Sequence, residues 1–540
     1  MKAKKYIYTL LVAVAAFMTT GCVDRLNIPK HGSLGGPENY YQTDDETMAA
    51  VASMYGSWRA QYYNWFMTLN ALSDDVWTGG GSRGDNADLE KLNEYTFDSS
   101  IGLVSSMYSE LYTIIYKANL ILDNVPGTTD VMKRAIAEAK VTRAWAHFNL
   151  VSLWGIAPAV DHVLDITEYH QSNGTPESTY AFVEQDLTEA IESGALPSKS
   201  NVNDKVTGIR LTLEAAKAFL GKVYLFEGKY SEAAQILDEV IDTKLYALYP
   251  DFDYLMHARA NNCEESIFEL QMRADPEQMW NWNNIVSFYG IMQGWRFGML
   301  SLTPEASQIF ATGTYGFFNP RKSLYDAFVE MEGEDGYRLN CTMRTYEQIQ
   351  AEGVSLINGG MLPGHESYFM WKNRSLKEDV TIDNPGFQIG QFIDFRVMRY
   401  AEVLLMAAEA HVQGNVDQSK ALDYINEVRQ RAQLAPLARV TLEDIQKEKR
   451  LELCLECTRY QDLVRWGLAE TVLGQQGEEI PAFSSVVKET DAEGNPISYE
   501  VVLTWPYYNN EYGFKARNKY LPIPLKELEV NPNMSQNEGW

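Results

Sequence analysis

Two stretches of the sequence combine flat aromatic rings with side chains that bind hydroxyl groups. Residues 279–297 contain Trp280, Trp282, Tyr289, Trp295 and Arg296, together with three asparagines. Residues 73–88 place Asp74, Trp77, Arg83 and Asn86 around a run of glycines, and Trp371 is an isolated third candidate. A pyranose has an apolar C–H face that packs on an aromatic ring, and its hydroxyls both donate and accept hydrogen bonds. We therefore expect these residues to bind a carbohydrate non-covalently; in the alternative interpretation, many of the rings are core residues.

The motifs that could indicate catalysis are weaker than the two stretches that indicate carbohydrate binding. Residues 80–84 fit the G-x-S-x-G pattern of a nucleophile elbow, but that elbow needs an apolar strand before it, and the preceding residues are polar. The seven histidines lack the H-E-x-x-H spacing of zinc proteases. Glycoside hydrolysis by a carboxylate pair stays open, because the chain has 73 acidic residues. No catalytic residue is assigned.

We expect no metal and no other cofactor. Cys454 and Cys457 form a lone C-x-x-C, and no second pair with zinc-ligand spacing accompanies them. We expect both cysteines in a helix, reduced and near the core. A calcium ion bound by the aspartates of residues 74–88 is an alternative, but their spacing is not that of an EF-hand.

The N-terminus has the features of an export signal. Lysines at positions 2, 4 and 5 precede an apolar run, Tyr6 to Met18, which is too short for a permanent membrane helix. The run ends in Thr19-Thr20-Gly21-Cys22, which looks like a bacterial lipobox. We expect residues 1–21 to be cleaved and Cys22 to carry lipid, which tethers the mature chain to a membrane. The alternative is an ordinary secretory peptide that contains a cysteine.

The formal charge of the chain is −27, and it becomes −30 once the three lysines of residues 1–21 are removed. No basic run of useful length occurs, so a nucleic-acid partner is not expected. The acidity favours neutral ligands only weakly, since surface charge is screened beyond about 8 Å in physiological salt. A local arginine pocket for an acidic sugar is compatible with this charge.

Helical periodicity dominates the sequence. Residues 131–154 place apolar side chains at spacings near three and four, which predicts an amphipathic helix, and another is expected near 107–124. Residues 211–241 and 399–432 each resemble a tetratricopeptide helix pair, with Gly228 and Gly414 at the turns. We predict a mostly α fold, a tetratricopeptide-like helical scaffold whose two similar pairs are separated by an insertion.

We expect residues 22–540 to form one domain, with the scaffold at about 40–250 and 395–470. Residues 250–395 lose periodicity and accumulate Gly, Asn and aromatic residues, which predicts a large irregular insertion that carries the ligand site. Residues 483–504 contain two extended stretches around a turn-rich segment, which predicts a β-hairpin within the C-terminal segment 475–540.

Four segments, in order, resemble the SusD/RagB family. The shared motifs are Arg143-Ala144-Trp145-Ala146-His147-Phe148, Arg399-Tyr400-Ala401-Glu402-Val403-Leu404-Leu405-Met406, Arg450-Leu451-Glu452 with Arg465-Trp466-Gly467, and Leu521-Pro522-Ile523-Pro524. Cys457 departs from the family pattern, which commonly has Gly there, and Cys454 replaces an apolar residue. The charged residues of the third segment have helical spacings that allow ion pairs, so we expect these motifs to serve structure rather than binding.

The resemblance implies a SusD-like fold and a non-enzymatic role. Members are nutrient-uptake lipoproteins on the outer face of the outer membrane, and they cap a SusC-like TonB-dependent transporter. They hold oligosaccharide, or peptide in RagB-like branches, until the transporter imports it. Family members often contact glycan through the regions equivalent to 73–88 and 279–297. A surface glycoside hydrolase and a purely structural cap are the other possibilities for this chain.

Overall fold

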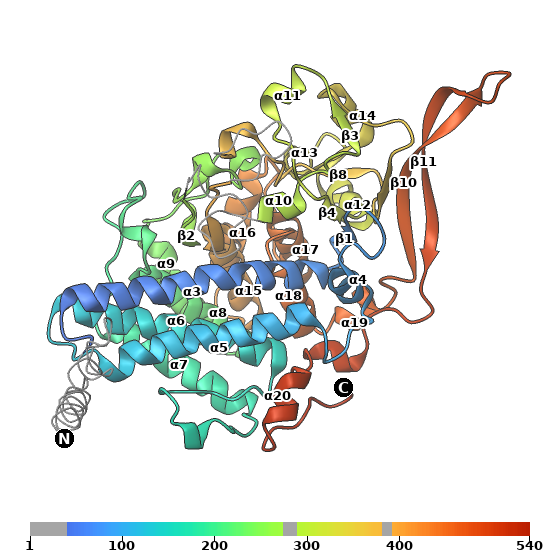
Figure 1. Cartoon of the computed structure of the whole chain (residues 1–540). Helices are drawn as coiled ribbons and strands as arrows, with labels where there is room; N and C mark the ends of the chain where they lie inside the picture. Colours follow the sequence, from blue (N-terminus) through green and yellow to red (C-terminus); the bar gives the residue numbers. More distant parts are fainter. Residues whose placement is uncertain (1–39, 274–288, 381–390) are drawn as a thin grey trace, which may run out of the picture.

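The computed structural model describes residues 40–273, 289–380 and 391–540. Trp280, Trp282 and Cys22 therefore lie outside the described residues. Within the described part, helices form a layered scaffold and short antiparallel strands form the rest (Figure 1). No described helix is both long enough and apolar enough to cross a membrane.

Three long helices form one side of the scaffold: α3 (Asp44–Ala71), α5 (Gly102–Asn124) and α6 (Asp130–Trp154), which pack against one another (Figure 1). Thr43 and Thr129 cap α3 and α6, since each hydroxyl accepts a hydrogen bond from a backbone N–H of the first turn. Inside, the Trp58 ring lies 4.6 Å from the Trp145 ring. The helices predicted near 107–124 and 131–154 are confirmed.

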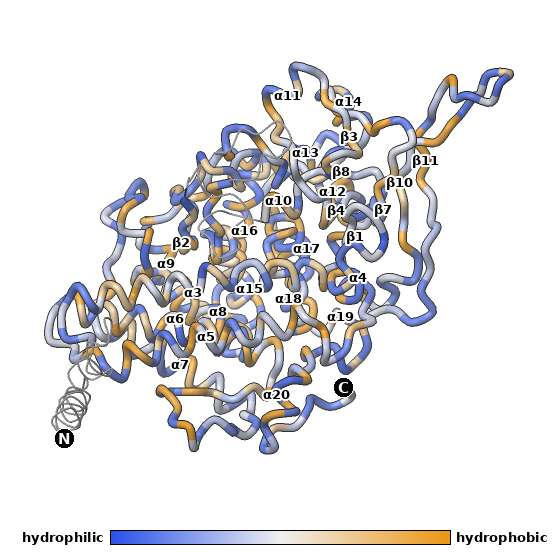
Figure 2. Tube along the Cα trace, viewed as in Figure 1, coloured by the Kyte–Doolittle hydropathy of each residue, from blue (hydrophilic) through white to orange (hydrophobic). Residues whose placement is uncertain are grey.

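The two predicted helix pairs are also confirmed and lie next to each other. They are α8 (Leu213–Glu227) with α9 (Tyr230–Asp242), and α15 (Tyr400–Gln413) with α16 (Gln418–Arg431). Helix α7 (Pro176–Glu192) joins α8 to α6, and α15 packs against α9. The α8–α9 crossing is close at Gly221, where an added Cβ would lie 2.5 Å from the Leu237 side chain. Figure 2 shows hydrophobic and hydrophilic residues alternating along these helices, as packing on one face requires.

The third family-like segment folds into α17 (Leu442–Leu453), α18 (Arg459–Arg465) and α19 (Ala469–Leu473). Its ion pairs mostly reach distant elements rather than neighbours on the same helix, which corrects the expectation from spacing. Glu452 pairs with Arg338, Arg399 and Arg431, and all four side chains are buried. The expected structural role of these residues therefore arises from tertiary contacts.

Cys454 and Cys457 are buried free thiols, but the helix expected around them ends at Leu453. Cys457 has a φ of 68°, in the left-handed region that only glycine adopts without strain. This backbone position therefore accounts for the glycine of the family pattern, and nothing in the structure explains why this chain has Cys457 there.

The segment between Asp251 and Arg399 contains short helices and strands. The helices are α10 (Tyr289–Gln293), α11 (Ala306–Ile309), α12 (Lys322–Glu332), α13 (Tyr337–Thr342) and α14 (Tyr346–Ala351). The strands are β2 (Ser266–Leu270), β3 (Leu300–Leu302), β4 (Phe317–Pro320), β5 (Met343–Thr345), β6 (Val354–Leu356), β7 (Met361–Pro363), β8 (Tyr368–Met370) and β9 (Phe395–Arg399). Antiparallel pairs β2–β9, β3–β6 and β5–β8 connect them.

Strand β4 also pairs with β1 (Val76–Gly79), which lies between α3 and α4 (Ala87–Glu94). Trp77 is opposite Asn319, and Gly79 is opposite Phe317. This pairing joins the N-terminal scaffold to the segment that was predicted as an insertion (Figure 1). It also brings the glycine-rich loop after β1 beside the start of β4, where the Gly80 N–H donates to the Gly316 carbonyl at 2.9 Å.

The predicted hairpin is confirmed and is longer than expected. It consists of β10 (Glu479–Thr490) and β11 (Pro496–Tyr508), and β7 pairs with the other edge of β10. The hairpin extends along the side of the molecule, and its tip projects away from the body (Figure 1). The chain then ends in α20 (Leu525–Val530) and an irregular tail.

Candidate functional site

The two stretches predicted to bind ligand meet where Arg296 lies over Gly81. A Cβ added to Gly81 would lie 2.3 Å from Arg296 Nη2, so the guanidinium occupies the space that a side chain would take. Asp85 Oδ2 accepts a hydrogen bond from the Gly81 N–H at 2.7 Å and lies 3.8 Å from Arg296 Nη1. The loop after β1 thus forms a seat for the arginine.

The Arg296 guanidinium makes one hydrogen bond to the described residues, and its other N–H groups are not used in this way. Its Nη1 donates to the Tyr315 carbonyl at 3.2 Å, and its Nε is buried without a partner among the described residues. The side chain is still 26% exposed. A guanidinium held in this way donates hydrogen bonds from fixed positions, which is suited to the hydroxyl oxygens of a sugar or to a carboxylate.

A small open pocket of about 60 Å³ adjoins Arg296. Its aromatic lining consists of Trp295, Phe297 and Phe310, and Thr314 and Ser375 add hydroxyl groups. Such a lining, mostly apolar with a few polar groups, is typical of small-molecule sites. Phe297 is 43% exposed and offers its ring to a ligand.

The Trp295 ring is held in place by neighbouring residues, so only part of it is open to a ligand. Its Nε1 donates to the Met370 carbonyl at 2.7 Å, and its ring lies 5.0 Å from that of Phe310. One part of the Trp295 ring faces the pocket, and the rest packs against the core around Trp371. Trp295 is therefore a candidate contact through the part of its ring that faces the pocket.

Trp77 is covered on two sides. The guanidinium of Arg321 lies 3.5 Å from its ring centre, and Trp505 on β11 meets it edge-on at 6.0 Å. Trp77 is buried, whereas Trp505 is 45% exposed. In this cluster, the ring that a ligand can reach is therefore that of Trp505, on the hairpin. It is not that of Trp77, the tryptophan that the sequence predicted.

Arg83 and Asn86 hold the loop in place. Arg83 forms an ion pair with Glu94 at 2.5 Å, and its guanidinium lies 5.6 Å from the ring centre of Tyr507 on β11. Asn86 caps α4, since its side-chain oxygen accepts from the Leu89 N–H. Both side chains are half-buried at the rim of the loop, so they position it and also lie within reach of a ligand.

Asp74 is part of the scaffold, contrary to the expectation that it binds ligand. Arg459 holds its carboxylate through two hydrogen bonds of 2.7 and 3.0 Å, and Arg450 approaches to 2.9 Å. Burial alone would raise the pKa of Asp74, but the two arginines hold it well below the usual range. Because the Asp74 carboxylate is buried and is held by two arginines, it is not available to a sugar hydroxyl.

Trp371 is likewise structural. It is buried, its ring lies between the guanidinium groups of Arg344 at 3.5 Å and Arg374 at 4.4 Å, and its Nε1 donates to Asp253 at 2.8 Å. Both ring faces are therefore occupied. Of the remaining candidates, Tyr289 is the first residue of α10, while Trp280 and Trp282 stay outside the described residues.

Four residues near the site were not predicted. Phe297 and Tyr315 come from the segment between Asp251 and Arg399, and Trp505 and Tyr507 come from β11. Phe297 directly follows Arg296, so its position in the aromatic stretch was an available clue. The alternation of β11 indicated that Trp505 and Tyr507 share a face, but only the fold brings that face to Trp77 and Arg83.

Geometry does not favour catalysis or a metal at the predicted positions. Ser82 lies in loop 80–86, which separates β1 from α4, whereas a nucleophile elbow is a sharp strand-to-helix turn. Among the residues that the structure describes, no group of three or more His, Cys, Asp or Glu side chains is placed to hold a metal ion. Asp74 and Asp75 are instead paired with Arg450.

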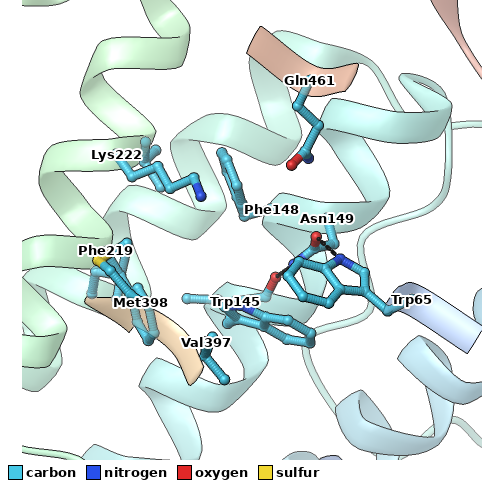
Figure 3. Close-up of a pocket in the computed structure, with 12 residues that line it drawn as sticks. Trp65, Trp145, Phe148, Asn149, Phe219, Lys222, Val397, Met398 and Gln461 are labelled. Carbon is cyan, nitrogen blue, oxygen red and sulfur yellow. Dashed lines mark hydrogen bonds between the residues drawn. The ribbon is translucent and has the colours of Figure 1, made fainter. Parts of the chain in front are cut away.

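A second, enclosed cavity lies inside the helical scaffold (Figure 3). Its lining includes Trp65 of α3, Trp145 and Phe148 of α6, and Lys222 of α8, whose side chains Figure 3 shows around one space. It offers about 20 Å³, room for about one water molecule. It is a packing defect of the core, too small for a glycan.

Comparisons with known proteins agree with this architecture. The profile of the SusD family matches residues 264–540, and a profile described as starch-binding associating with outer membrane matches residues 39–225. A SusD-like protein of Formosa agariphila is 25% identical, with 99% of each chain covered. The starch-binding protein SusD of Bacteroides thetaiotaomicron is 26% identical, also with 99% of each chain covered. The solved structure of a laminarin binding SusD-like protein is 29% identical with a TM-score of 0.76, over 93% of this chain and all of that one.

Proposed function

The chain belongs to the SusD family, and from this premise we propose that it is a cell-surface lipoprotein that captures an oligosaccharide and delivers it to a SusC-like TonB-dependent transporter. In this role it binds glycan without changing it covalently. The observation that carries the proposal is the seat of Arg296 on the Gly81 loop beside an aromatic pocket.

The pocket chemistry supports a saccharide ligand. Phe297 and Trp295 offer ring surface, and Arg296, Thr314 and Ser375 offer polar groups at its edge. This is the combination that one sugar ring needs, an apolar wall and hydroxyl-binding groups close together. Trp505, Arg83 and Asn86 lie along the neighbouring rim and extend the proposed site, together with Trp280, Trp282 and Tyr289 from the sequence-based expectation.

The names of relatives indicate which glycans to test first. One relative is named a starch-binding protein and one solved structure is of a laminarin binding protein. Both names refer to neutral glucans, which suit an acidic chain better than anionic glycans do. We propose laminarin and starch as the first ligands to test.

The proposed location is the outer membrane, with the protein facing the cell exterior and anchored by lipid on Cys22. Support comes from the lipobox-like sequence Thr19-Thr20-Gly21-Cys22 and from a matching family described as associating with the outer membrane. Delivery to a transporter barrel is what the family resemblance implies for a tethered binding protein.

Isothermal titration of the purified protein with laminarihexaose and maltoheptaose tests the function, alongside an assay for new reducing ends. Saturable binding without release of reducing ends, weakened in Phe297→Ala and Arg296→Ala, supports the proposal. Release of reducing ends indicates a glycoside hydrolase and contradicts it. Binding to peptide mixtures but to neither glycan indicates the RagB-like alternative. Absence of any ligand affinity in a folded protein indicates a purely structural cap.

A further inference from the structure

A tyrosine-lined pocket lies at the opposite side of the molecule from α10 and α11, between α5, the loop 158–171 and α20 (Figure 1). It is open and has a volume of about 280 Å³, close to the lower end of the range of about 300–1,000 Å³ that is usual for small-molecule sites. Tyr108, Tyr112 and Tyr169 contribute aromatic rings, and Leu164 and Met534 complete the apolar wall. None of these residues belongs to the site proposed above.

The rim of this pocket is held in a fixed shape. Asn531 Nδ2 donates to the Gln171 carbonyl at 2.7 Å, and Asn533 Nδ2 donates to the His170 carbonyl at 2.7 Å. On the other side, the Tyr112 hydroxyl donates to the Pro158 carbonyl at 2.7 Å. The C-terminal tail is thereby fastened to the loop, so the pocket exists before any ligand arrives.

Two polar groups in the pocket have hydrogen-bonding capacity left for a ligand. The Tyr108 side chain is 2% exposed, and its hydroxyl has beside it only the Tyr112 hydroxyl, without a hydrogen bond of good geometry. The Glu527 carboxylate lines the same pocket and forms no ion pair with any residue that the structure describes, and burial raises its pKa. A buried hydroxyl and a half-buried carboxylate both gain from a ligand that supplies hydrogen bonds.

The lining restricts the class of ligand. No Lys or Arg is among the described residues that line the pocket, which disfavours phosphate, sulfate and uronate ligands. An entirely apolar ligand would leave Glu527 and Tyr108 unpaired. An organic cation would pair with Glu527, but it accepts no hydrogen bond from the Tyr108 or Ser109 hydroxyls. A sugar hydroxyl accepts from a tyrosine and donates to a carboxylate at once.

We propose that this pocket is a second saccharide site, which binds one ring of a neutral glycan with Tyr169 as its stacking platform and Glu527 and Tyr108 as hydrogen-bonding partners. Tyr169 is 61% exposed and stands at the rim, where an aromatic ring is accessible to a passing chain. Two sites on opposite sides of one molecule hold a long polysaccharide more firmly than either alone, since the second contact is intramolecular.

Affinity electrophoresis of the purified protein in gels containing laminarin, starch, xylan or galactomannan tests the second site. The variants are Tyr169→Ala and Glu527→Gln, with Ile166→Ala as the matched control, because Ile166 lies in the same loop, is 77% exposed and does not line the pocket. We expect each pocket variant to weaken retardation by the bound polysaccharide about three- to tenfold, and the control to leave it unchanged. Circular dichroism checks that all variants are folded.

The outcomes separate this site from the one in the Arg296 pocket. If Phe297→Ala reduces the retardation but Tyr169→Ala and Glu527→Gln do not change it, the second site is overturned and the proposed function stands. Retardation reduced by Tyr169→Ala and not by Phe297→Ala keeps the second site and overturns the placement of the first. If tetramethylammonium abolishes the part of the retardation that depends on Tyr169, the pocket is a cation site, and the proposal of a sugar site is overturned. No retardation in any gel contradicts both proposals.

Discussion

The Arg296 guanidinium lies over Gly81, 215 positions earlier in the chain, in the space that a side chain at Gly81 would fill. Gly81→Ala therefore forces the guanidinium or the loop to move, since the added Cβ would lie 2.3 Å from Nη2. We expect glycan affinity to fall about tenfold, because a hydrogen bond from a charged donor contributes about 1.5–3 kcal/mol. Titration with the bound oligosaccharide measures this.

Gly208→Ala is the matched control for Gly81→Ala, because a Cβ at Gly208 meets nothing within 4 Å. Unchanged affinity in Gly81→Ala, with wild-type affinity also in Gly208→Ala, would show that the seat of Arg296 does not matter for binding.

Arg399 is central to the buried ion pairs of the scaffold. It pairs with Glu265, Glu452 and Glu456, and its side chain is 2% exposed. Arg399→Met removes one counter-charge from each of three buried carboxylates, which keep only Arg338, Arg431 and Lys372. We therefore expect the free energy of unfolding to fall by about 3–5 kcal/mol. Arg259→Met is the control, since the Arg259–Glu378 pair is exposed and contributes about 1 kcal/mol or less. Urea unfolding curves compare the two; equal losses would contradict this account.

Glu110 makes stability depend on pH near neutrality. It accepts a hydrogen bond from Asn64 at 2.9 Å, while its other oxygen is buried without a partner, and burial raises its pKa to about 7. Between about pH 4.5 and 7 the unfolded chain binds fewer protons at this residue than the folded chain does. Its contribution to the free energy of unfolding therefore falls as pH rises through this window, by on the order of 2–3 kcal/mol.

Glu110→Gln removes this titration. Relative to wild type, we expect the variant to gain stability as pH rises from 4.5 to 7.5, which urea unfolding at the two pH values measures. A difference between the two proteins that does not change with pH would show that Glu110 titrates normally in the folded protein.

Cys22 lies outside the described residues, and its lipidation is a prediction from sequence. In cells, Cys22→Ser should abolish incorporation of radiolabelled palmitate and move the protein out of the membrane fraction, because a single cysteine carries the anchor. A mutant protein that still sediments with the outer membrane would contradict the lipid anchor.

The sequence predicts those parts of the fold that local chemistry decides. Helices α5, α6, α8 and α15 follow from apolar spacing, and the hairpin follows from two extended stretches around a turn. The helical spacing of Arg450 to Arg465 correctly indicated ion pairs, and Asp462–Arg465 at 2.8 Å is one of them. The other partners lie on distant elements, about which spacing within a helix carries no information.

The candidate site depends on such distant contacts. Asp74 has the residue type of a sugar ligand, but Arg459, 385 positions away, engages its carboxylate. Trp371 has a suitable ring, but two arginines cover its faces. Conversely, the exposure of Trp505 beside Trp77 follows from how the hairpin docks, which no local pattern encodes.

An immobilised glycan array, probed with wild type and a Trp280→Ala/Trp282→Ala double variant, tests the central claim most directly. The account predicts that the wild type binds a defined set of neutral oligosaccharides, and that the double variant, folded by circular dichroism, loses this binding while Phe297→Ala weakens it. A blank array with folded wild-type protein would contradict glycan capture as the function of this chain.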